Sequence, residues 1–206
     1  DDLQTFVRQR LAKNNLIIGV VGDITPDELG KRLDATFGKL SPEAASWKLE
    51  KVDPVSKGQV IVIDRDIPQS SILIAEKGVM RDDPDFYSAY VLNHMLGGGS
   101  FTSRLYAEIR EKRGLVYSVG TGLYPFDNSA LILGSAGTAN KSVYQTLSLI
   151  NAEWDKMAMG DIGQKELDDA KTYLTGSFPL RFSSSGQIAS MLVGMQMAHS
   201  LQQILV

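Results

Sequence analysis

The feature that most constrains the fold of this chain is the alternation of short apolar runs, rich in Val, Ile and Leu, with longer stretches of helical periodicity. The apolar runs are expected to form strands at residues 16–21, 59–64, 71–79, 115–123 and 130–138. Most of these expected strands occur in pairs along the sequence, with helices between and after the pairs. The pattern therefore predicts an α+β fold, a two-layer α/β sandwich in which a mixed, mostly antiparallel sheet is covered by helices.

The helical stretches carry start and stop signals. Helices are expected at about residues 3–11, 25–38, 83–97, 100–114, 141–159, 163–176 and 184–206. Thr25 and Glu28 have the form of a capping box, with Pro26 at the first helical position. Gly114 is placed to end a helix in a left-handed conformation. Residues 41–58 contain Pro and Ser without a clear period, so a linker is expected there.

Charge and composition exclude several classes of protein. The chain carries 21 Lys and Arg against 24 Asp and Glu, and its basic residues are scattered, which argues against a nucleic-acid partner. Because there is no cysteine, disulfides, thiolate nucleophiles and cysteine zinc sites are excluded. The longest uncharged stretch begins at Phe182 and is interrupted by Ser and Gln, so we expect a packed helix there and no membrane span.

The two ends of the sequence suggest a segment of a longer polypeptide. The first residue is Asp1 rather than methionine, and the last three are Ile204, Leu205 and Val206. The absence of cysteine favours an exported bacterial protein, such as a periplasmic one, with a cytoplasmic or organellar setting as the alternative.

Two features that often carry chemistry favour plain structural roles here. Residues 97–100 read Gly-Gly-Gly-Ser but lack the Lys-Ser/Thr of a phosphate loop, so a flexible turn is the favoured interpretation. His94 and His199 lie far apart, and neither has a carboxylate at a helical ligand spacing, so we expect packed or surface residues rather than zinc ligands. A Gly-x-Ser-x-Gly elbow, which would indicate a serine hydrolase, is absent from the sequence.

A third feature is the helix expected from Ser100, which carries several arginines, stops at Gly114 and turns directly into a strand. Arg110 near the helix end and Tyr117 in the strand could converge on one site. From the pattern alone the plainer interpretation is favoured, in which Arg110 is a solvated charge and Tyr117 a core residue. The small residues on the opposite strand face would permit close approach by a helix or an extended peptide: Ser118, Gly120 and Gly122.

Three separated blocks resemble a known family. Residues 96–105 (Leu-Gly-Gly-Gly-Ser-Phe-Thr-Ser-Arg-Leu) and 109–119 (Ile-Arg-Glu-Lys-Arg-Gly-Leu-Val-Tyr-Ser-Val) closely resemble the non-catalytic half of the pitrilysin/insulinase zinc metallopeptidases. Residues 15–27 (Asn-Leu-Ile-Ile-Gly-Val-Val-Gly-Asp-Ile-Thr-Pro-Asp) resemble the strand and helix start found late in that family's catalytic domain. The resemblance covers most of the chain.

The resemblance implies a LuxS/MPP-like metallopeptidase fold and a division of the chain between two related domains. Residues 1–57 would be the tail of a catalytic-type domain plus a linker, and residues 58–206 most of the non-catalytic, substrate-binding domain. The family's zinc motif, His-x-x-Glu-His, would survive here only as a degenerate remnant, with Tyr90, Asn93 and His94 at its three positions. One imidazole is too few ligands for zinc, and Asn cannot act as a general base. We therefore expect no metal on this chain and zinc on a partner domain or subunit.

By the same resemblance, Arg110 would hold backbone carbonyls of a peptide substrate and Tyr117 would donate its hydroxyl toward the scissile carbonyl. We carry no role onto Arg104 or Arg113. The chain would thus be the substrate-binding, zinc-free portion of a metalloendopeptidase. It would hold no complete catalytic set and be inactive alone, with a homodimer or heterodimer as its assembly.

Two alternatives remain at this stage. One is a structural or interaction protein that kept the fold and lost peptidase activity. The other is a free-standing module that binds peptides. An intact zinc motif in the same polypeptide or in a companion chain would favour the enzyme over both.

Overall fold

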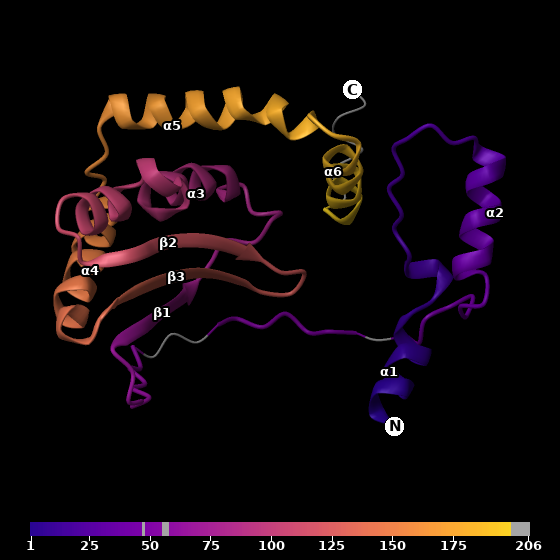
Figure 1. Cartoon of the computed structure of the whole chain (residues 1–206), viewed down its shortest axis with the longest axis horizontal. Coiled ribbons are helices and arrows are strands. Elements are labelled where there is room, and N and C mark those ends of the chain that lie inside the picture. The colour runs from indigo at the N-terminus through magenta and orange to yellow at the C-terminus, as the bar shows by residue number, and fades with distance from the viewer. Residues whose placement is uncertain (47, 55–57, 199–206) are drawn as a thin grey trace. The chain divides into compact units, whose positions relative to one another are not determined.

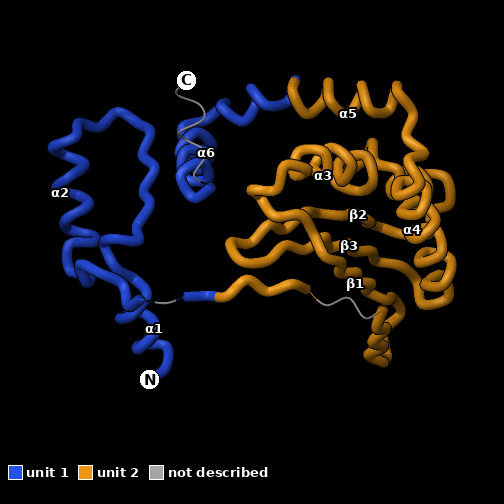
Figure 2. The backbone as a smooth tube through the Cα atoms, turned by 180° about the vertical axis from the view of Figure 1, so that it is seen from behind, with its two compact units in different colours: residues 1–49, 176–206 blue, residues 50–175 orange. Residues whose placement is uncertain are grey.

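The computed structural model describes residues 1–46, 48–54 and 58–198. The chain forms two compact units, residues 50–175 and residues 1–49 with 176–206 (Figure 2). The expected linker at residues 41–58 and the last expected helix at residues 184–206 lie partly outside the described residues. The domain boundary predicted at residue 57 also falls there and stays a prediction.

The larger unit is built on a three-stranded antiparallel sheet in the order β1-β3-β2 (Figure 1). Its strands are β1 (Gln69–Lys77), β2 (Val116–Pro125) and β3 (Ala130–Ala139). β2 and β3 form a hairpin, whose turn is closed by a hydrogen bond from the Phe126 N–H to the Ser129 carbonyl of 2.8 Å. The structure confirms these three expected strands with small shifts of their ends.

Helices cover one face of this sheet. They are α3 (Phe86–Asn93), which continues as a π-helical turn (His94–Gly98), a second π-helical segment (Tyr106–Glu111) and α4 (Val143–Ala158). α5 (Gln164–Ser177) runs along the outer side of α3 (Figure 1). Between helices and sheet lies one cluster of buried apolar side chains: Leu96, Leu105, Ile109, Val116, Val119, Ala136 and Ile150. The predicted α+β architecture of helices on a sheet is therefore confirmed.

The helix expected over residues 100–114 is interrupted at Ser103. A short 3-10 turn, Ser100–Thr102, comes first, and Ser103 is extended with φ −76° and ψ 154°. The Ser103 hydroxyl, fully buried, donates a hydrogen bond of 2.8 Å to the Ser100 carbonyl. This side chain satisfies a backbone group locally, which is how Ser competes with helical hydrogen bonding.

The second unit holds α1 (Asp2–Arg10), α2 (Pro26–Phe37) and α6 (Ser185–Met197). The Thr25 hydroxyl accepts a hydrogen bond of 3.3 Å from the Glu28 N–H, so the predicted cap and the helix start are confirmed. Ser184 caps α6 in the same way through the Gln187 N–H. Among the described helices, none combines the length and the apolar character that crossing a bilayer requires.

Two of the expected strands, residues 16–21 and 59–64, do not form in the described structure. Residues 16–21 pass beside α6 instead, and a Cβ at Gly19 would lie 2.7 Å from the Ala189 carbonyl oxygen. Residues 59–64 make no ladder, and Val60 and Val62 are 85% and 84% exposed. Apolar β-branched residues favour a strand, but a strand needs a partner, and neither segment has one among the described residues.

Candidate functional site

The candidate site is organised around the turn at Gly114, which joins a helix to β2. The Gly114 N–H donates to the Arg110 carbonyl (2.9 Å), the hydrogen bond of an αL cap, and the Leu115 N–H donates to the Ile109 carbonyl (3.0 Å). Gly114 has φ +61°, a conformation in which a side chain would be strained. The predicted left-handed glycine is confirmed, and it fixes Arg110 and β2 relative to one another.

Tyr117 is the extra residue of a β-bulge. Val116 pairs with Thr138 and Ser118 with Gly137, so nothing lies opposite Tyr117. The bulge allows both Val116 and Val119 to be buried against the helices, although they are three positions apart. Tyr117 itself is 84% exposed. The interpretation of Tyr117 as a core residue was therefore wrong, because it assumed a strand without a bulge.

Arg110 rests on an aromatic ring. Its guanidinium carbon lies 4.8 Å from the centroid of Tyr106, which is buried, and Arg110 is half-buried. Such contacts between a guanidinium and a ring are attractive and restrict the side chain. Tyr106 was missed as a functional residue, although its spacing of four residues from Arg110 on a helix was the available signal.

The three arginines of this region differ in their partners. Arg104 forms a two-pronged ion pair with Glu166, with Nε to Oε1 and Nη2 to Oε2 both at 2.6 Å, and Nη2 also donates to the Asp161 carbonyl. Arg113 pairs with Glu108 at 2.7 Å. Within the described part of the chain, Arg110 makes no ion pair with a carboxylate. Of the three arginines, Arg110 is thus the one without a carboxylate partner among the described residues.

Two residues of the degenerate zinc motif, Tyr90 and His94, pack against aromatic rings. Tyr90 stacks on Phe86 with a centroid distance of 6.4 Å, and His94 on Tyr173 at 5.1 Å. Burial lowers the pKa of His94 below its ordinary value of 6.5, so the imidazole is neutral at physiological pH. No group of three side chains that could hold a metal exists among the described residues. These positions do not fit zinc.

The glycine run after the motif is packed closely rather than free. Gly97 is buried, and a Cβ there would lie 2.6 Å from both the backbone nitrogen and the Oγ1 of Thr121. A Cβ on Gly98 would meet Asn93 Nδ2 at 2.5 Å, and one on Gly99 would meet the His94 carbonyl at 2.7 Å. The expectation of a flexible turn is therefore corrected: the glycines allow the helix end to pack against β2 and against the motif residues.

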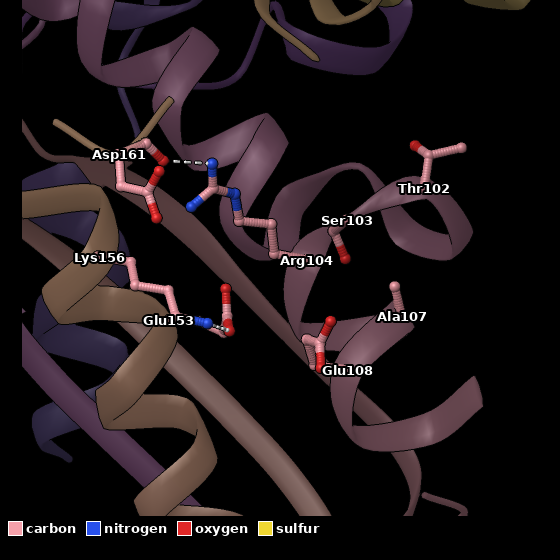
Figure 3. A pocket seen from close by; sticks show the side chains of 8 residues that line it. All are labelled: Thr102, Ser103, Arg104, Ala107, Glu108, Glu153, Lys156 and Asp161. Carbon is pink, nitrogen blue, oxygen red and sulfur yellow. Dashed lines mark hydrogen bonds and ion pairs between the residues drawn. The ribbon is translucent and has the colours of Figure 1, made fainter. Parts of the chain in front are cut away.

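A hollow of about 290 Å³ lies beside Arg104, between the segment that carries it and α4 (Figure 3). Glu153 and Lys156 line it and pair with each other at 2.6 Å, and the Glu153 side chain is only 7% exposed. Glu108 lines it too and is paired with Lys112 and Arg113, which hold the pKa of this carboxyl below its ordinary value. Because every charged side chain that lines this hollow except Asp161 forms an ion pair, we interpret it as part of the scaffold.

Comparisons with known proteins identify the family of this chain. Residues 1–174 match the profile described as "Peptidase M16 inactive domain". An uncharacterized zinc protease of Streptomyces coelicolor is 28% identical over 199 residues, which are 91% of this chain and 42% of that protein. A Helicobacter pylori protein named "Non-peptidase homolog YmxG" is 30% identical over 190 residues, 88% of this chain and 42% of that protein. The chain thus spans less than half the length of these relatives.

Solved structures give the same result. The structure described as a peptidase M16 inactive domain from Pseudomonas fluorescens has a TM-score of 0.69 and 29% identity, and the match covers 90% of this chain and 44% of that chain. A protease from Helicobacter pylori has a TM-score of 0.65 and 20% identity, covering 90% of this chain and 46% of that one. The second likeness concerns the fold alone.

Proposed function

The chain belongs to the peptidase M16 (pitrilysin/insulinase) family as its inactive domain, and we propose that it binds extended peptides for a zinc site on another domain or subunit. Arg110 and Tyr117 would supply the contacts. The observation that carries the proposal is the difference among the arginines: only Arg110 of the three lacks a carboxylate partner within the described residues, and it lies across the Gly114 turn from an exposed Tyr117.

In this proposal the two residues divide the work. The guanidinium of Arg110 donates hydrogen bonds to backbone carbonyls of the peptide, which fixes its register. The Tyr117 hydroxyl donates toward the oxygen of the scissile carbonyl, where negative charge develops, and a donor placed there acts mainly in the transition state. Zinc, held elsewhere, would supply the activated water.

Kinetics of the full-length, zinc-loaded protein, or of its complex with a zinc-bearing subunit, test this proposal. We expect Tyr117→Phe to lower kcat about 100- to 1,000-fold with a smaller rise in KM. Arg110→Ala should raise KM about 10- to 100-fold, since it removes hydrogen bonds from a charged group. Zinc content should stay unchanged in both variants.

Matched controls come from the same unit. Tyr144 is as exposed as Tyr117, at 84%, and Arg113 is an ion-paired neighbour of Arg110. Tyr144→Phe and Arg113→Ala should leave kcat and KM near those of the parent protein. A large rise in KM at unchanged kcat for Tyr117→Phe would assign this residue to ground-state binding instead.

A second candidate function is that of a structural or interaction protein without peptidase activity. The Helicobacter pylori relative named as a non-peptidase homolog favours it. Absence of zinc and of peptide hydrolysis from the full-length protein and its complexes would establish this alternative.

A further inference from the structure

Three side chains before the Gly114 turn form a connected row, with Phe101 on the 3-10 turn and Tyr106 and Arg110 on the π-helical segment. The ring of Phe101 meets that of Tyr106 edge to face, with centroids 4.9 Å apart and planes at 76°, and the Arg110 guanidinium lies over the Tyr106 ring. Tyr106 is 6% exposed, whereas Phe101 is 68% exposed. The row therefore runs from a buried ring that holds Arg110 to a large apolar side chain in solvent.

The backbone that presents Phe101 is strained and reinforced. Ser100, directly before it, has φ +52°, and within the described chain it is the one residue other than glycine with positive φ. The turn is tied by the Ser103 hydroxyl on the Ser100 carbonyl and by the Thr102 hydroxyl on the Gly99 carbonyl (3.0 Å). Strain of this kind persists where the surroundings impose it, and it concentrates at binding sites. Here its result is an exposed phenylalanine against the same Tyr106 ring that Arg110 contacts.

From this arrangement we propose that Tyr106 is a positioning residue for Arg110, and that Phe101 is the apolar wall of a subsite that selects peptides with a large apolar side chain. The inference rests on the proposed function, because it takes Arg110 as the group that holds the peptide. The contact with the ring restricts the guanidinium of Arg110, whose N–H groups can still donate hydrogen bonds. In this proposal a peptide whose carbonyl is bound by Arg110 has a neighbouring side chain against Phe101, because Phe101 and Arg110 contact the same Tyr106 ring.

The positioning role is tested by a double-mutant cycle in the full-length, zinc-loaded protein. Tyr106→Phe keeps the ring and should leave kcat/KM unchanged, whereas Tyr106→Leu keeps apolar volume without the ring and should lower kcat/KM about 3- to 30-fold. In an Arg110→Ala background the effect of Tyr106→Leu should vanish. A merely structural role would lower activity in both backgrounds, and that result would overturn the inference.

The selectivity role is tested with paired peptides that differ only by Phe or Ala at successive positions. Phe101→Ala should reduce the preference for Phe over Ala at one position about 10-fold. Phe126→Ala, at a side chain that is 53% exposed in the β2–β3 turn, is the matched control. A uniform loss across all peptides would overturn the subsite.

The two proposals fail in distinguishable ways. If Arg110→Ala and Tyr117→Phe impair the enzyme but Tyr106→Leu and Phe101→Ala do not, the subsite is wrong and the function stands. If Arg110→Ala leaves kcat and KM unchanged, the proposed function fails, and the inference that rests on it fails too.

Discussion

The two units of the molecule have similar amphipathic elements but different interiors. In residues 50–175 the buried apolar side chains form a cluster between helices and sheet, whereas in the other unit Ala12 is the one buried apolar residue among those described. The apolar side of α1 is exposed, with Leu3 at 83% and Phe6 at 54%. The periodicity of apolar residues predicts a helix, but most of the stability of a helix comes from packing of its apolar side against other elements. The units should therefore respond differently to the same kind of substitution.

Truncation of an apolar side chain should show the largest difference. Ile109→Ala, at a residue with 0% exposure in the core cluster, should cost about 2–5 kcal/mol of unfolding free energy, because it leaves a cavity. Phe6→Ala in α1 should cost less than about 1 kcal/mol, because that ring is half in solvent already. Urea unfolding followed by circular dichroism, with hydrogen exchange to separate the units, measures both. Equal losses would contradict the contrast in packing.

Ion pairs give the second contrast. Arg104→Ala removes a two-pronged pair whose side chains are 16% and 32% exposed, and should cost about 1.5–3 kcal/mol. Arg32→Ala removes the pair with Glu28, whose side chains are 69% and 51% exposed, and should cost about 0.3–0.5 kcal/mol. Raising the salt concentration should weaken the Arg32 pair more than the Arg104 pair. A greater salt dependence of Arg104 would indicate that its pair is solvated.

Glycine to alanine should have opposite signs in the two units. Gly114 has φ +61°, so Gly114→Ala should destabilise by about 1–2 kcal/mol although the space around it is open. Gly30 lies inside α2 with nothing near its Cβ position, so Gly30→Ala should stabilise by about 0.5–1 kcal/mol. Both changes are read from the midpoint of urea unfolding. Stabilisation by Gly114→Ala would show that the turn relaxes into a right-handed conformation.

The same contrast explains which features the sequence could predict. The cap at Thr25 and the left-handed Gly114 depend on a few consecutive residues, and both predictions hold. The strand predicted at residues 59–64 does not form, because a strand depends on a partner that local pattern cannot reveal.

The exposure and the ion pairing of the candidate site residues depend still more on residues that are distant in the sequence. What separates Arg110 from Arg104 is Glu166, which lies on α5, far along the chain. The exposure of Tyr117 depends on a bulge, which only the register with β3 shows. The sequence therefore identified Arg110 and Tyr117 as candidates, but tertiary packing determines which side chains are exposed or without an ion-pair partner.

The smallest expected effect is a pH dependence that belongs to the larger unit. His94 is partly buried, which lowers its pKa in the folded state below the ordinary value of 6.5. Below that value the unfolded chain binds more protons than the folded one, so stability should fall as the pH falls through about 6.5 toward the folded pKa. We expect a lower urea midpoint at about pH 5.5 than at about pH 7.5, and His94→Gln should flatten this difference.

Loss of the Glu108 ion pairs belongs to a separate pH range, below the ordinary carboxyl pKa of 4.5. His199→Gln, at the other histidine of the sequence, is the matched control. If His199→Gln flattened the profile and His94→Gln did not, the pH dependence would not come from the burial of His94.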